Sequence, residues 1–165
     1  MKSIILLILL TNLFSQDISF VVDSITESGY NIIIEDSLQN YTTHNFGVAC
    51  ITVANGDNNY MNTTEFRQVL ELKSQHTIVM LGSNDIRFYN KLYEVWGSIW
   101  TYEYKWLIIQ LKKNSKVLLC TIPYQQNTNG TFPAIDKIND KINDIAKEFE
   151  LEEVDINAAL GSNSN

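Results

Sequence analysis

The feature that most limits the possible folds of this chain is the alternation of short strand-like segments with longer helical or polar ones. Strands are predicted at residues 18–22, 42–48, 77–81, 116–122 and 153–156. Nearly continuous apolar strands that alternate with helices are typical of a parallel sheet covered on both faces. We therefore predict one α/β domain built on five parallel strands.

Helical patterns fill much of the sequence between these strands, at residues 30–38, 66–72, 93–112 and 137–150. The last pattern is the clearest, because Ile138, Ile142 and Ile145 recur at helical spacing. The sequence NTTE at residues 62–65 has the spacing of a capping box, which makes Asn62 the expected N-cap of the helix that follows.

The charge of the chain argues against a nucleic-acid partner. It has 12 Lys and Arg residues against 19 Asp and Glu, a formal net charge of −7, and its basic residues form no run. Its 165 residues are enough for one domain with a substantial core.

The first 16 residues have the pattern of a secretory signal peptide. Lys2 gives a positive start, an apolar run covers residues 4–10, and the small Ser15 follows. The run is too short to cross a bilayer as a helix. A first buried strand or helix is the alternative, but another strand candidate follows at once. We therefore predict a leader at 1–16, a secreted domain at 17–165 and no membrane span in the mature chain.

Other features bear on the secreted state. Three Asn-x-Thr sequons begin at Asn40, Asn62 and Asn129, which predicts a glycoprotein. Cys50 and Cys120 both lie in apolar segments, so two buried thiols and one disulfide remain alternatives. The cysteine spacing predicts no metal site, and no cofactor is expected.

Three residues that can act on an ester lie where predicted strands end. Ser24 offers a hydroxyl nucleophile, Gly47 allows close backbone approach to a ligand, and Asn84 brings a carboxamide donor. Each alone has an ordinary explanation, as a helix cap, a bulge and a turn. Ligands of parallel sheets bind beyond the carboxyl ends of the strands. Together these residues therefore suit acyl transfer, with a serine beside donors that hold the oxyanion.

The blocks DSIT, NFGV and LGSND resemble, in this order, the first three sequence blocks of the SGNH (GDSL) hydrolases, a family of serine esterases and lipases. VLLCTIP resembles the fourth strand of that family, and IAKEFELEEVDINAAL resembles its last helix and fifth strand. The likeness covers about residues 17–160, and LGSND is its most specific part.

This resemblance implies a three-layer, flavodoxin-like sheet and a small ester substrate. It implies Ser24 as the nucleophile, with an oxyanion hole formed by the N–H groups of Ser24 and Gly47 and the side chain of Asn84. The branch that this chain resembles includes carbohydrate O-acetylesterases, so an acetylated carbohydrate is a further expected substrate.

The chain also differs from the family pattern. The glycine that opens the first block is Val22 here, and the Asp-x-x-His block that follows the fifth strand in the family does not occur. His76 precedes the third strand and His44 is expected within the second, so neither is expected beside the serine. The alternatives are an active esterase and a non-catalytic binding protein or truncated copy. Without the family's final helix, we expect exposed apolar surface and marginal stability.

Aromatic residues recur at helical spacing after the third strand, at Tyr89, Tyr93, Trp96 and Trp100. This spacing predicts a helix face packed on the sheet. The alternative is that the first of these residues line the substrate cleft, since aromatic faces suit a sugar ring or an acyl chain.

Overall fold

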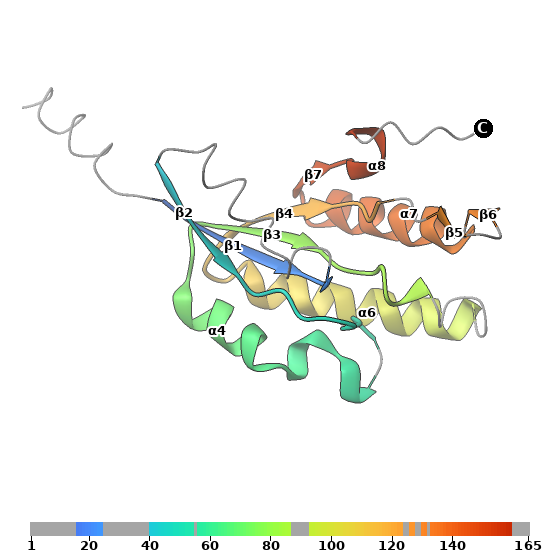
Figure 1. The fold of residues 1–165 in the computed structure, drawn as a ribbon, viewed down its shortest axis with the longest axis horizontal. Helices are drawn as coiled ribbons and strands as arrows, with labels where there is room; N and C mark the ends of the chain where they lie inside the picture. Colours follow the sequence, from blue (N-terminus) through green and yellow to red (C-terminus); the bar gives the residue numbers. More distant parts are fainter. Residues whose placement is uncertain are drawn as a thin grey trace, which may run out of the picture.

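A parallel sheet of five strands forms the centre of the chain in a computed structural model, in the order β2-β1-β3-β4-β7 (Figure 1). The strands are β1 (Gln16–Val22), β2 (Tyr41–Asn45), β3 (His76–Met80), β4 (Lys116–Cys120) and β7 (Glu152–Val154). The structure describes residues 16–24, 40–54, 56–86, 93–123, 126–127, 130–131 and 133–159. The predicted α/β class and the five-stranded parallel sheet are therefore confirmed.

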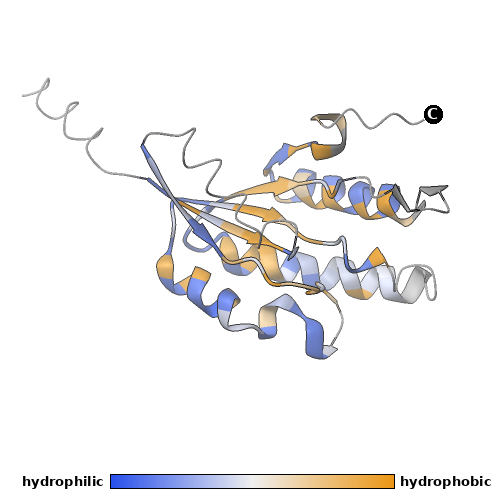
Figure 2. Ribbon diagram, viewed as in Figure 1, coloured by the Kyte–Doolittle hydropathy of each residue, from blue (hydrophilic) through white to orange (hydrophobic). Residues whose placement is uncertain are grey.

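Three helices pack on one face of this sheet: α4 (Thr64–Leu72), α6 (Tyr93–Leu111) and α7 (Pro133–Glu148). Alternate strand residues such as Val21, Val79 and Leu119 join them in the main core, because side chains of a strand point to opposite faces in turn. The other face carries a smaller buried cluster that includes Phe20 and Val22. Figure 2 shows β1, β3 and β4 as largely apolar, as a sheet with two buried faces requires.

Helix α4 begins one residue later than its capping box predicts. The N-cap is Thr63, whose hydroxyl accepts a hydrogen bond from the Phe66 N–H at 3.1 Å. Asn62 instead belongs to the 3-10 helix η2 (Tyr60–Asn62), and its side chain donates to the Gly56 carbonyl. The predicted cap at Asn62 is therefore wrong.

Helices α6 and α7 confirm the two longest helical predictions. In α7, the side chains of Ile138, Ile142 and Ile145 are fully or almost fully buried. In α6, Trp100 is fully buried and Trp96 nearly so, which supports their prediction as core residues. The side chain of Tyr93 is not described, and Tyr89 lies outside the described residues.

The remaining described elements are short: the 3-10 helix η1 (Gly56–Asn58), the antiparallel pair β5 (Gln126–Asn127) and β6 (Gly130–Thr131), and α8 (Ile156–Ala159). No described helix has both the length and the apolar character needed to cross a membrane. The predicted helix at 30–38, nearly all of the predicted leader and the sequon at Asn129 lie outside the described residues.

The two cysteines are both free thiols. Cys120 is buried, as predicted for its apolar segment, and this burial raises the pKa of its thiol to about 11. Cys50 is exposed and has a left-handed backbone, with φ of 58°. The prediction that both thiols are buried is wrong for Cys50, because the chain has left β2 and turned toward solvent at this point.

Candidate functional site

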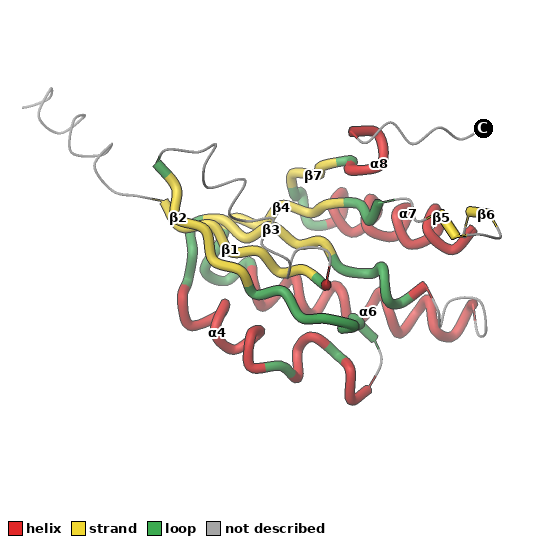
Figure 3. The backbone as a smooth tube through the Cα atoms, viewed as in Figure 1, coloured by secondary structure: helices red, strands yellow, loops and turns green. Residues whose placement is uncertain are grey.

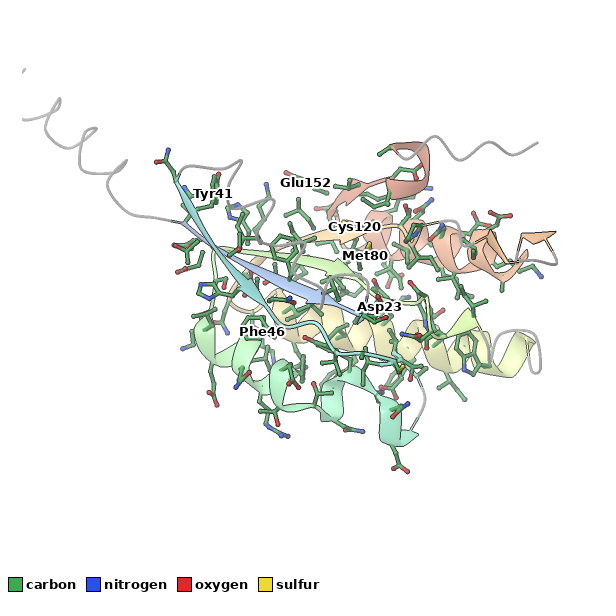
Figure 4. All side chains as sticks on the ribbon, in the orientation of Figure 1. Asp23, Tyr41, Phe46, Met80, Cys120 and Glu152 are labelled. Carbon is green, nitrogen blue, oxygen red and sulfur yellow. The ribbon has the colours of Figure 1, made fainter. Side chains whose placement is uncertain are left out.

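The carboxyl ends of β1, β2 and β3 lie side by side. In the ladder of β1 with β3, Val22 is opposite Met80. The segment after β2 continues alongside β1, where the Val48 N–H donates to the Val22 carbonyl at 3.2 Å. Figure 3 shows the loops after β2 and β3 leaving the sheet on the side where β1 ends, and Figure 4 labels Asp23 and Met80 there. Residues that directly follow the three strands therefore share one rim.

Ser24 stands at this rim, two residues beyond Val22, and is exposed to solvent. Val22, which replaces the family's glycine, is the last residue of β1 and is 1% exposed. The branched side chain extends the strand by one buried residue, and the chain passes from it through the buried Asp23 to the exposed serine. The position of Ser24 beyond the sheet is thus compatible with valine at position 22.

Gly47 lies beside the end of β1, between two backbone hydrogen bonds that join Phe46 to Phe20 and Val48 to Val22. Its N–H donates to the side-chain oxygen of Asn45 at 2.9 Å, at an exposed position. This N–H is therefore occupied by an amide oxygen, and a ligand oxygen could bond it only by replacing the Asn45 side chain.

Asn84 follows β3 by four residues, and its carboxamide is fixed by a hydrogen bond from Nδ2 to the Ile51 carbonyl at 3.0 Å. The loop that carries it turns at Gly82, whose φ of 131° is poorly suited to other residues. A Cβ at this glycine would lie only 3.1 Å from the Ile138 side chain. The turn that delivers Asn84 therefore needs glycine for both backbone and space.

Asp85 ties the loop after β3 to the loop after β2. Its fully buried carboxylate accepts hydrogen bonds from the Val53 N–H at 3.1 Å and the Ala54 N–H at 3.3 Å. The pKa of Asp85 is raised to about 7, mainly by burial and also by the charge of Asp23, while the two N–H groups and the Trp100 side chain act in the opposite sense. Sequence reasoning missed this role, although a carboxylate directly after a buried strand and a turn was the available signal.

The histidines lie away from this rim. His76 is the first residue of β3, at the amino end of the strand. His44 is within β2, opposite Ser19 of β1, and its Nε2 lies 2.8 Å from Asp17 Oδ1. Ser24 is five residues beyond Ser19, and the three of these that belong to β1 alone span about 10 Å. The described residues therefore bring Ser24, Gly47 and Asn84 to one rim and place neither histidine with them.

The described residues also contain no group of three or more His, Cys, Asp or Glu side chains arranged to hold a metal ion.

Solved structures share this fold. An acetyl xylan esterase, AlAXEase, superposes with a TM-score of 0.71 at 20% identity, over 88% of this chain and 80% of its own. Axe2, an acetylxylan esterase from Geobacillus stearothermophilus, gives a TM-score of 0.70 at 18% identity, over 90% of this chain and 80% of its own. The predicted resemblance to SGNH hydrolases is thus confirmed at the level of the fold. No protein-family model matches the chain, and neither does any curated protein.

Further solved structures are catalytic mutants of Axe2 in which a serine, an aspartate or a histidine is replaced by alanine. The aspartate and the histidine of that enzyme are three positions apart in its sequence. The present chain contains no Asp-x-x-His sequence.

Proposed function

We propose that this chain is an SGNH-type serine hydrolase domain that cleaves carboxylic esters, and acetyl esters of carbohydrates in particular. One observation carries the proposal: Ser24, Gly47 and Asn84 follow three neighbouring strands at one rim of a sheet with the fold of acetyl xylan esterases. Ligands of such sheets bind at this rim.

In this mechanism the Ser24 hydroxyl attacks the acyl carbon, and the carbonyl oxygen takes up the negative charge. The N–H groups of Ser24 and Gly47 and the side-chain amide of Asn84 donate to that oxygen. Collapse of the intermediate expels the alcohol and leaves acyl-Ser24, which water then hydrolyses. No described histidine lies beside Ser24, so in this proposal a water molecule carries the serine proton to the departing alcohol oxygen, and turnover is slow.

The test is hydrolysis of p-nitrophenyl acetate by the domain at residues 17–165. We expect a rate above that of buffer, which returns to the buffer rate in Ser24→Ala. Asn84→Ala should remove most of the activity, since one oxyanion donor typically contributes about 3 kcal/mol of transition-state stabilisation. Equal rates in the wild type and in Ser24→Ala would exclude Ser24 as the nucleophile.

The second candidate is a non-catalytic protein that binds ester ligands at the same rim. The position of His44 and His76 away from Ser24 favours it. This candidate predicts no hydrolysis above buffer, together with saturable binding of acetylated xylotriose in calorimetry. Asn84→Ala should weaken that binding, whereas Ser24→Ala should leave it largely intact.

We also propose that residues 1–16 are a leader and that the domain is secreted and glycosylated at Asn40, which is exposed. Gln16 is the first residue of β1, and its N–H donates to the Asn40 carbonyl at 3.0 Å. Cleavage after Gln16 would therefore leave almost the whole strand in place. Mass spectrometry of secreted protein, before and after glycosidase treatment, tests both the cleavage site and the glycan.

A further inference from the structure

We infer that a groove on the helical side of the molecule binds a neutral oligosaccharide, independently of whether Ser24 is catalytic. The groove has a volume of about 640 Å³ and lies between α6 on one side and η1, η2 and the start of α4 on the other. It is a different place from the rim that holds Ser24.

Aromatic side chains on α6 form one wall of this groove. Tyr102 and Trp106 line it and are 68% and 48% exposed. They share a helix face with Ile99, which is 48% exposed, because residues three and four apart lie on the same side. By contrast, Trp100 and Tyr104 of the same helix are fully buried in the core. The outer face of α6 thus presents a Tyr and a Trp to solvent, the side chains most often used as binding anchors.

Polar groups form the opposite wall and part of the floor. The Asn59 carboxamide donates to Glu103 Oε2 at 3.4 Å, and its own oxygen accepts from the Met61 N–H at 2.8 Å. Asn62 also lines the groove, with its Nδ2 donating to the Gly56 carbonyl at 3.0 Å. The amides of Asn59 and Asn62 thus stand opposite the aromatic side chains, and the Glu103 carboxylate stands beside those side chains on α6; all three groups can exchange hydrogen bonds with hydroxyl groups.

The composition of the lining selects among ligand classes. A purely apolar ligand would remove the Glu103 carboxylate and the two amides from water and offer them no further hydrogen bonds, which is costly. None of the described residues that line the groove is Lys or Arg, and the chain carries a net charge of −7, so an anion would be repelled. A neutral polyhydroxylated ring satisfies both walls, because its apolar face packs on the aromatic side chains and its hydroxyls bond the amides and the carboxylate.

The groove is joined to the rim through one residue. Ala54 lines the groove, and its N–H donates to Asp85 at 3.3 Å, next to Asn84. An extended saccharide held in the groove would therefore lie near the loop that borders the candidate site.

The test is binding of xylohexaose and cellohexaose, followed by calorimetry and tryptophan fluorescence. The protein is Ser24→Ala, produced in a host that does not glycosylate, so that neither hydrolysis nor a sugar on the Asn62 sequon interferes. We expect saturable binding of at least one hexasaccharide. Trp106→Ala and Tyr102→Ala should each weaken it by more than about fivefold, as truncation of an aromatic anchor does. Ile109→Ala, at an exposed position of α6 outside the groove, should leave it unchanged.

Several results would overturn the inference. The first is that neither sugar binds at concentrations up to about 10 mM. The second is that both aromatic substitutions leave the binding unchanged. The third is that light scattering shows a dimer, and that this dimer dissociates in Trp106→Ala. A glycan found on Asn62 of secreted protein would also overturn it, because it would occupy the groove. p-Nitrophenyl acetate carries no saccharide, so its hydrolysis by the wild type tests the esterase proposal alone, and failure here is distinguishable from failure of that proposal.

Discussion

At the carboxyl end of the sheet, Ser24 is exposed to solvent. Ser24, Gly47 and Asn84 each lie in the segment that follows one of three neighbouring strands. Toward the amino end of β1, Asp17 is paired with His44 of β2, with His44 Nε2 2.8 Å from Asp17 Oδ1. The Asp17 carboxylate is thus most of the length of β1 away from Ser24, and the His44 side chain is directed toward that carboxylate.

The amino end also contains hydroxyl groups, which the fold uses differently. Ser19 and Ser74 are both buried there, and their Oγ atoms are 2.6 Å apart. They bond to each other below the surface, whereas Ser24 is exposed to solvent. The comparison teaches that the surroundings that a strand end gives to a hydroxyl, more than the residue type, decide whether it can meet a ligand.

The largest expected effect concerns Asp85, which holds the carboxyl rim together. Its pKa is raised from 3.8 to about 7, so between these pH values the native state binds one more proton than the unfolded state. The stability from this group is therefore greatest below about pH 4 and falls by about 1.4 kcal/mol per pH unit until about pH 7, or roughly 4 kcal/mol in all.

Asp85→Asn removes this dependence, because an amide does not titrate in this range. The measurement is urea unfolding of both proteins between pH 4 and pH 8. The free energy of unfolding of the variant, relative to that of the wild type, should increase as the pH rises. If the free energies of unfolding of the two proteins changed with pH in parallel, Asp85 would ionise normally in the folded state. That result would contradict the role assigned to Asp85 at the rim.

The next effect tests the turn that delivers Asn84. Gly82→Ala should destabilise the protein by about 3 kcal/mol, from the strained φ and from contact of the new methyl group with Ile138. Gly56→Ala is the matched control: its φ of 36° is also positive, but nothing lies within 4 Å of the added Cβ. We expect the control to cost only about 1 kcal/mol in urea unfolding. If both substitutions lowered the free energy of unfolding equally, the packing around Gly82 would be loose.

A smaller effect is expected at Cys50, which occupies a left-handed conformation just after the rim. Cys50→Gly should stabilise the protein by about 0.5–1 kcal/mol, because glycine adopts this conformation without strain. Cys50→Ser keeps the strained backbone and should bring no gain. If Cys50→Ser also raised the thermal stability, the effect would come from removal of the thiol and not from relief of backbone strain. Thermal unfolding of the three proteins provides the comparison.

The smallest effect is expected at the amino end. His44→Gln and His76→Gln should leave p-nitrophenyl acetate hydrolysis within about twofold of the wild type, since neither residue reaches the proton of Ser24. Loss of activity in His44→Gln, with unchanged thermal stability, would break the comparison between the two ends of the sheet.

The order of elements was predictable, because strand and helix periodicities are strong where one face is buried. The spacing of Ile138, Ile142 and Ile145 predicted α7, and these side chains are indeed buried. Local details were less accessible. The N-cap of α4 is Thr63 and not the predicted Asn62, because a 3-10 helix precedes α4 and includes Asn62. Such a helix has no clear periodicity in sequence.

The candidate site residues were selected because they follow predicted strands. The contacts that support them could not be predicted from the sequence. The bonds of Asp85 to Val53 and Ala54 join residues about thirty positions apart, which no local pattern shows. The exposure of Trp106 was equally hidden. Helix α6 is apolar on all sides, so its periodicity does not show which aromatic residues face the core.

The carboxylate that joins the two loops has a consequence for ligand binding. Asp85 holds Val53 and Ala54, in the segment after β2, against the turn after β3, and Asn84 of that turn donates to the Ile51 carbonyl. The two loops are therefore joined before any ligand arrives, so the entropy of ordering them is lost during folding and not during binding.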